Sequence, residues 1–131
     1  MKYSVRPSLI GAFLMTDPSK RSIRNLDPRE SSLLIREKAG DPDFLILDVR
    51  TPQEHEMGRI EGSVNIDYHS PAFLAEIERL DREKAYLVYC LTGIRSRNAV
   101  KVMEQLGFED VYNMLGGIRQ WGLEGLPIVG R

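Results

Sequence analysis

The single cysteine of the chain, Cys90, lies where an apolar segment meets a short loop that contains glycine. The segment from Tyr86 to Tyr89 is aromatic and β-branched, which predicts a buried strand with Cys90 at its carboxyl end. From Ser96 onward, apolar residues recur at helical spacing until Gly107, which predicts a helix. The stretch is therefore expected to fold as strand, loop and helix, with the thiol at the start of the loop.

Three features of this stretch favour the thiolate form of Cys90 over the thiol. A helix that begins near Ser96 leaves amide hydrogens unpaired in its first turn, and these carry partial positive charge. In the loop from Cys90 to Arg95, Gly93 permits backbone angles at which amide groups turn inward toward an anion. Arg95 and Arg97 add positive charge nearby. A lone buried cysteine is often inert, but these surroundings are typical of a nucleophile.

Length and composition place the chain among ordinary globular proteins. Its 131 residues are 42% hydrophobic and 28% charged, which suits one domain with a buried core. The formal charge of -1 gives no reason to expect nucleic acid or a membrane as a partner. One cysteine excludes an internal disulfide and a redox pair, and the two histidines lack metal-ligand spacing. We therefore expect neither a metal nor a cofactor.

The first 21 residues are predicted to be an N-terminal extension, an apolar arm or strand that is partly disordered. Its apolar run from Leu9 to Met15 follows early basic residues, so a signal peptide is the alternative interpretation. The run is too short to cross a bilayer, and Thr16-Asp17-Pro18 follows it where a cleavage site needs small residues. We expect the arm to pack on the domain or on a second subunit of a cytoplasmic protein, which would be a monomer or a homodimer.

Residues 22–131 are predicted to form one domain in which strands and helices alternate. Apolar or β-branched segments predict strands at 22–26, 44–47, 63–66, 86–89 and 110–115. The intervening segments carry helix caps, among them Asp27 and Thr51, or helical spacing. The order therefore predicts a three-layer α/β domain with a mainly parallel sheet and helices on both faces. Ligands of such folds bind at the carboxyl ends of strands, where Cys90 and Asp48 both fall.

Four segments resemble the motifs of the rhodanese-like domain, a family of single-domain sulfurtransferases. The matching segments are 47–50 with Glu54, 58–66, 88–96, and 115–121 with 125–127. They occur in the order of the family between residues 22 and 129. The chain departs from the family pattern at Arg59, where many members have histidine, and the resemblance does not cover the extension before residue 22.

The resemblance implies a five-stranded parallel sheet and a sulfurtransferase that takes a sulfane sulfur from a donor such as thiosulfate. Cys90 would hold this sulfur as a persulfide and then pass it to a thiophilic acceptor. The implied site has the catalytic residues Cys90 and Arg95 and the substrate-binding residues Leu91, Thr92, Gly93, Ile94, Ser96 and Arg97. The Thr92 hydroxyl could bond to the sulfur or only to the loop, and of the two we expect the bond to the sulfur.

Three further residues are expected to support the site rather than to react. The Asp48 carboxylate, at a strand end, is predicted to accept hydrogen bonds from loop amides. Arg50 is predicted to pair with Glu54 four residues later on a short helix. His55, between two glutamates on the same helix, is expected to be solvated.

Two other classes of function remain open. Sites of phosphatases and arsenate reductases of related fold resemble Cys-x5-Arg, whereas this chain has Cys-x4-Arg from Cys90 to Arg95. The shorter spacing predicts a tighter loop that suits one sulfur atom better than phosphate. The other alternative is a sulfur-carrier or regulatory binding module with little turnover on thiosulfate. The expected partners are a small anionic sulfur donor and a protein that donates or accepts sulfur, with no nucleic acid and no membrane.

Overall fold

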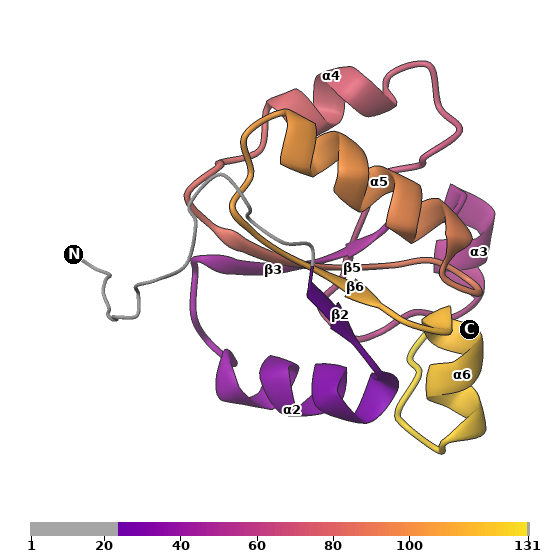
Figure 1. Cartoon of the computed structure of the whole chain (residues 1–131). Helices are drawn as coiled ribbons and strands as arrows, with labels where there is room; N and C mark the ends of the chain where they lie inside the picture. Colours follow the sequence, from indigo (N-terminus) through magenta and orange to yellow (C-terminus); the bar gives the residue numbers. More distant parts are fainter. Residues whose placement is uncertain (1–23, 131) are drawn as a thin grey trace.

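The structure is a computed structural model that describes residues 24–130. It contains a five-stranded sheet in the order β2-β6-β5-β3-β4, in which every neighbouring pair of strands is parallel (Figure 1). The strands are β2 (Arg24–Leu26), β3 (Phe44–Asp48), β4 (Val64–Asn65), β5 (Ala85–Tyr89) and β6 (Asp110–Met114). The predicted extension, residues 1–21, lies outside the described residues.

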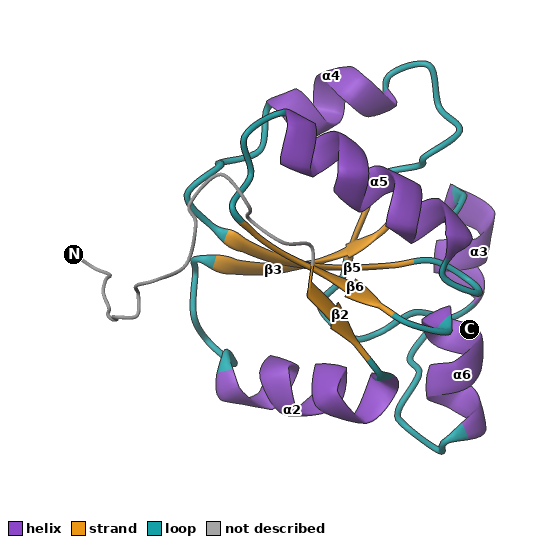
Figure 2. Ribbon diagram, in the orientation of Figure 1, coloured by secondary structure: helices purple, strands orange, loops and turns teal. Residues whose placement is uncertain are grey.

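Helices cover both faces of the sheet, so the molecule has three layers (Figure 2). On one face lie α4 (Phe73–Glu78) and α5 (Ile94–Gln105), and on the other lie α2 (Pro28–Glu37) and α6 (Gly117–Leu123). The short helix α3 (Pro52–Met57) lies at one end of the sheet. The prediction of a three-layer α/β domain is confirmed, and the sheet is parallel throughout. None of the helices within residues 24–130 is long and apolar enough to cross a membrane.

The central strand β5 separates two hydrophobic cores because its side chains alternate between the faces of the sheet. Tyr86 and Val88 pack with the core beneath α4 and α5. Leu87 and Tyr89 pack with the core beneath α6, which includes Trp121. All five residues of β5 are buried, as a strand covered on both faces requires.

Two helices begin at the capping residues that the sequence indicates. The Asp27 side chain accepts a hydrogen bond from the Glu30 N–H at 2.8 Å, and the Glu30 side chain accepts one from the Asp27 N–H at 2.9 Å. Thr51 and Glu54 make the same reciprocal arrangement at the start of α3. Each capping box satisfies two amide groups that the helix leaves unpaired, which fixes where α2 and α3 begin.

The strand β4 is shorter than the predicted segment 63–66. It pairs with β3 only through Leu47 opposite Val64 and Asp48 opposite Asn65. Beyond this ladder the two segments stay joined by single hydrogen bonds, from the Ile66 N–H to the Asp48 carbonyl at 3.0 Å and from the Tyr68 N–H to the Val49 carbonyl at 3.1 Å. The end of β3 therefore lies beside β5 and β4 at the same edge of the sheet, where the polar residues of the site gather.

Candidate active site

Cys90 directly follows β5, the central strand, and lies at the carboxyl edge of the sheet. Its side chain belongs to the core beneath α5, and only 1% of it is exposed. The position at the end of a parallel strand agrees with the sequence-based prediction, whereas the depth of burial was not predicted.

Three polar groups surround the sulfur of Cys90. The Gly93 N–H donates to Sγ at 3.0 Å and the Ser96 N–H donates to it at 3.3 Å, while Sγ itself donates to the Ser96 Oγ at 3.4 Å. Ser96 itself is fully buried. Gly93 is the N-cap residue of α5 and has no side chain with which to cap the helix. The Cys90 sulfur therefore accepts the Ser96 N–H, which an N-cap side chain would otherwise accept. The two amide donors and the helix start stabilise negative charge on the sulfur.

The helix α5 begins at Ile94, two residues before the predicted start near Ser96. The predicted loop from Cys90 to Arg95 is therefore shorter, and Ile94 and Arg95 belong to the first helical turn. Gly93 makes this early start accessible, because its φ of 109° is a left-handed conformation that other residues resist. Helical spacing alone did not reveal the earlier start.

The start of α6 holds the loop after Cys90 from the other side. The Ile118 N–H donates to the Cys90 carbonyl at 2.9 Å, and the Arg119 N–H donates to the Leu91 carbonyl at 3.0 Å. Gly117 allows this approach, because a Cβ atom there would lie 2.2 Å from the Leu91 oxygen. With these two carbonyls fixed on α6, the peptide planes of the loop have little freedom to rotate.

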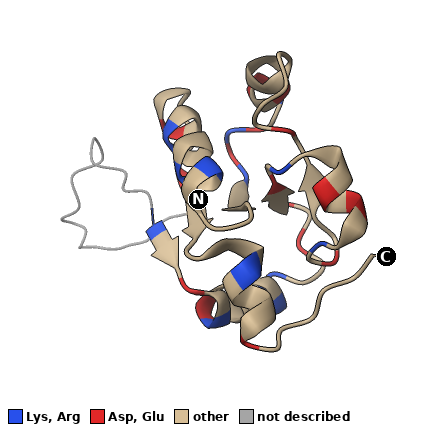
Figure 3. Ribbon diagram, turned by 90° about the vertical axis from the view of Figure 1, so that its right-hand side faces the viewer, with Lys and Arg blue, Asp and Glu red and all other residues tan. Residues whose placement is uncertain are grey.

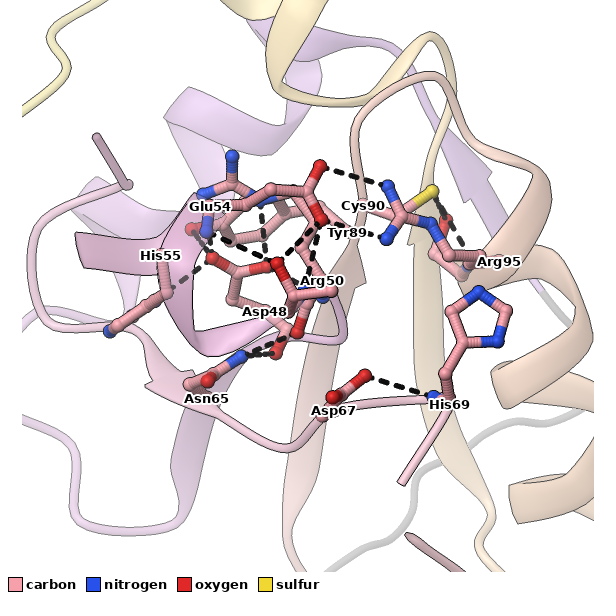
Figure 4. Close-up of polar contacts among 12 residues, drawn as sticks. Asp48, Arg50, Glu54, His55, Asn65, Asp67, His69, Tyr89, Cys90 and Arg95 are labelled. Carbon is pink, nitrogen blue, oxygen red and sulfur yellow. Dashed lines mark hydrogen bonds and ion pairs between the residues drawn. The ribbon is translucent and has the colours of Figure 1, made fainter. Parts of the chain in front are cut away.

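Arg95 binds Glu54 and does not donate to the sulfur of Cys90. Two hydrogen bonds join the guanidinium to the carboxylate, at 2.9 and 3.1 Å (Figure 4). They lower the pKa of Glu54 to about 2, although burial opposes this change. Hydrogen bonding to Glu54 also raises the pKa of Arg95, and the charge of Cys90 acts in the same direction. The predicted pairing of Glu54 with Arg50 is therefore wrong.

Arg50 instead binds Asp48 at the end of β3. Its Nε and Nη2 donate to the Asp48 carboxylate at 2.9 and 2.7 Å, and Nη2 also donates to the Gly58 carbonyl at 2.6 Å. Asp48 is fully buried, and its Oδ1 also accepts the Arg50 N–H at 3.0 Å. Although burial opposes it, the hydrogen bonds and charge of Asp48 raise the pKa of Arg50. The two residues form a buried pair that fixes the turn after β3.

Two residues of this network were missed by sequence reasoning. The Tyr89 hydroxyl lies 3.1 Å from Asp48 Oδ2, and His55 Nδ1 lies 2.9 Å from the same oxygen. His55 is therefore not the solvated residue that was predicted, since only 20% of its side chain is exposed. Its contact is with a residue of the preceding strand, so the spacing within its own short helix gave no signal.

The remaining predicted site residues do not contact the sulfur. Thr92 is exposed, and among residues 24–130 no hydrogen bond joins its hydroxyl to Sγ, contrary to the expectation. The structure brings Gly93 and Ser96 to the sulfur and leaves the side chains of Leu91, Ile94 and Arg97 exposed at the surface.

An apolar groove of about 630 Å³ lies next to the site, between α3 and α6. We call it the α3–α6 groove. Its most exposed apolar side chains are Met57 and Leu123, each 73% exposed, with Ile128 at 46% and Leu91 at 40%. Glu54 and Arg119 also line it. The groove therefore shares Glu54 with the Arg95 pair and continues into the loop that begins at Cys90.

The chain is similar to several known proteins. It matches the family model for the rhodanese-like domain over residues 32–124. It is 36% identical over 125 residues to a tRNA uridine(34) hydroxylase of Cytophaga hutchinsonii, which covers 92% of this chain and 38% of the hydroxylase. It is 37% identical over 101 residues to a sulfurtransferase of Allochromatium vinosum, which covers 76% of this chain and 92% of that protein. The chain thus spans less than two fifths of the hydroxylase and nearly all of the sulfurtransferase.

A solved structure shows the same architecture. A rhodanese-related protein from Thermoplasma volcanium is 34% identical, with a TM-score of 0.62 over 81% of this chain and 97% of that chain. The fold therefore agrees with that of a protein solved by crystallography.

Proposed function

Because the chain belongs to the rhodanese-like domain family, we propose that it transfers a sulfane sulfur from a donor such as thiosulfate to a thiophilic acceptor through a persulfide on Cys90. The observation that carries the proposal is the convergence of the Gly93 and Ser96 N–H groups on the Cys90 sulfur. A sulfur anion held by fixed donors is a reactive nucleophile, and the same donors stabilise charge during transfer.

The proposed reaction has two displacement steps at sulfur. The Cys90 thiolate attacks the outer sulfur of thiosulfate, a new sulfur–sulfur bond forms, and sulfite leaves with the electron pair of the broken bond. An acceptor nucleophile then attacks the outer sulfur of the persulfide, and Cys90 leaves as the thiolate. No oxidant or reductant is consumed, and the chain needs no second cysteine.

The roles of the charged residues follow from their contacts. Arg95 is held by Glu54, so we assign it to positioning the loop and to the positive field that draws an anionic donor toward the rim. Asp48 and Arg50 support the turn beside it. This differs from an arginine that contacts the donor directly, and it predicts a larger effect of Arg95 substitution on loop order than on donor affinity.

The proposal is tested by measuring the intact mass of the protein after incubation with thiosulfate. We expect one added sulfur atom on Cys90, released by cyanide as thiocyanate, and no addition on Cys90→Ser. An aryl phosphate is the parallel substrate, because the related phosphatases cleave it. Hydrolysis of the phosphate without sulfur loading would contradict the proposal.

The similarity to tRNA uridine(34) hydroxylases supports a second candidate, in which this domain is a module of an enzyme that acts on tRNA. The similarity extends over 92% of this chain but over a minority of the hydroxylase. The test is the mass of uridine 34 in tRNA incubated with the protein and an oxygen source. One added oxygen would favour this candidate, and sulfur loading without it would favour sulfur transfer.

A carrier module would load sulfur from a partner protein faster than from thiosulfate.

A further inference from the structure

The α3–α6 groove exposes more apolar surface than the chemistry at Cys90 requires. Met57, Leu91, Leu123 and Ile128 come from four separate segments and line one hollow. Scattered exposed apolar side chains are ordinary, but a contiguous group of them beside a reactive residue is typical of a binding surface. The volume of the groove, about 630 Å³, lies within the range of about 300–1,000 Å³ that is typical of pockets for drug-sized ligands. Thiosulfate and cyanide are much smaller than that.

The charges that line the groove differ in whether they are already paired. Glu54 is held by Arg95, and Arg50 is held by Asp48. The side chain of Arg119 is exposed, and within the described part of the chain it has no hydrogen bond or ion pair. Arg119 is therefore the cation of this groove that can bind an incoming anion.

We propose that the α3–α6 groove binds an apolar segment of a partner protein that carries a cysteine and a nearby carboxylate, and thereby presents that cysteine to Cys90. Apolar side chains of the segment would cover Met57 and Leu123, and its carboxylate would pair with Arg119. The inference rests on the proposed function and names the class of acceptor. The thiolate of the partner attacks the outer sulfur of the Cys90 persulfide, the persulfide forms on the partner, and Cys90 leaves as the thiolate.

A nucleic acid fits this surface less well than a protein segment. Binding to phosphates needs several cations along the path of the backbone, and the groove offers Arg119 with an apolar lining. The side of the molecule that carries α3 and α6 shows basic and acidic residues intermixed, without a continuous basic stripe (Figure 3). RNA is therefore an outcome of the test rather than the proposed partner.

The test measures transfer of sulfur from loaded Cys90 to three synthetic peptides in a single turnover. Each peptide has one cysteine. In the first peptide, leucines flank the cysteine and aspartates follow them. The second peptide has the same leucines, with lysines in place of the aspartates. The third has serines in place of leucines and retains the aspartates. We expect the leucine–aspartate peptide to accept sulfur about tenfold faster than either of the others.

Variants assign the effect to the groove. Met57→Ser combined with Leu123→Ser should reduce transfer to the leucine–aspartate peptide about tenfold, while loading from thiosulfate and release by cyanide stay unchanged. Leu74→Ser is the matched control, because Leu74 is 49% exposed but lies on α4, on the opposite face of the sheet. Arg119→Glu should reverse the preference between the aspartate and lysine peptides.

Four outcomes would overturn the proposal. They are equal transfer to all three peptides, no change in the double variant, a tRNA stem-loop that competes with the peptide for the groove, and a dimer of the protein that the double variant dissociates. The last two would assign the groove to RNA or to a second copy of the chain. If the unmodified protein took up no sulfur from thiosulfate, the proposed function itself would be contradicted. Failure of the groove proposal and failure of the proposed function are therefore distinguishable.

Discussion

The carboxylate of Glu54 is shared between the cap of α3 and the guanidinium of Arg95. Its Oε1 accepts the Thr51 N–H at 3.0 Å and the Arg95 Nη1 at 2.9 Å, and Oε2 accepts Nη2 at 3.1 Å. One side chain therefore joins the turn after β3 to the first turn of α5, although 41 positions separate the two residues. The loop that surrounds Cys90 is held on this side by Glu54 and on the other by α6.

The first prediction concerns the energy of this ion pair. A double-mutant cycle with Glu54→Ala and Arg95→Ala should give a coupling of about 1 kcal/mol in the free energy of unfolding, because the pair is bidentate and largely covered. Urea denaturation measures it. The pair of Arg29 and Glu124 is the control: its atoms are 3.6 Å apart and Arg29 is 70% exposed, so its coupling should be only about 0.3 kcal/mol. Equal coupling in the two cycles would contradict the structure.

The second prediction concerns the acid range. The pKa of Glu54 is about 2 in the folded protein, against an ordinary value of 4.5. A lowered folded pKa means that the unfolded chain binds the proton first, so the stabilisation is present above pH 4.5 and is lost as the pH falls toward 2. The Glu54→Gln variant should be less stable than the unmodified protein at neutral pH. It should also lose less stability than the unmodified protein as the pH falls from 4.5 toward 2. Denaturation curves at several pH values measure the difference, and parallel curves for the two proteins would be inconsistent with it.

The sequence predicted the layers of this fold because each relevant signal was local. The apolar runs ending at Asp48 and Cys90 identified the buried parallel strands, and the capping residues Asp27 and Thr51 identified two helix starts. The period of side chains along a strand or helix is set by the backbone itself, so it can be recognised without knowledge of the tertiary structure.

The pairing of charges within the site could not be predicted in the same way. Glu54 has Arg50 four residues before it, which suggested a local pair, but Arg95 approaches from α5 and takes the carboxylate. Arg50 turns back to Asp48, which is buried and needs a compensating charge. Both choices depend on which segments meet at the carboxyl edge of the sheet, and that information is tertiary.

The third prediction concerns the hydroxyl of Tyr89. It donates to the buried Asp48 carboxylate at 3.1 Å and accepts the Ile60 N–H at 3.1 Å, and burial and the charge of Asp48 raise the pKa of Tyr89 to about 12. The hydroxyl therefore stays neutral and donates across the physiological range. Tyr89→Phe should cost about 2–3 kcal/mol of unfolding free energy because buried partners lose a hydrogen bond.

Tyr86→Phe is the control for this substitution. Its hydroxyl donates to the Asp81 carbonyl at 2.6 Å at the other end of β5, away from the site. The loss should be about 1 kcal/mol, with sulfur loading of Cys90 unchanged. In Tyr89→Phe, by contrast, the loading rate should fall, because the Asp48–Arg50 turn loses one of its supports. A loss of stability in Tyr89→Phe no greater than in Tyr86→Phe would show that the hydroxyl is not needed by Asp48.

The fourth prediction tests whether α6 positions the loop that follows Cys90. A Cβ at Gly117 would lie 2.2 Å from the Leu91 oxygen and 2.6 Å from the Cys90 oxygen, so Gly117→Ala must displace backbone atoms of the loop. Gly125 is the matched control, because its φ of +78° is also left-handed while nothing lies within 4 Å of its Cβ position. Gly125→Ala should therefore cost only the strain of that conformation, about 1 kcal/mol, and should load sulfur normally.

Gly117→Ala should lose both stability and loading, because the same clash breaks the hydrogen bonds from Ile118 and Arg119 to the loop carbonyls. When those carbonyls rotate, the Gly93 N–H also turns away from the Cys90 sulfur. Thermal denaturation measures the stability, and the loading rate per folded molecule measures the site. Wild-type loading by a folded Gly117→Ala protein would mean that the loop keeps its geometry without α6, since Gly125→Ala already accounts for the backbone strain.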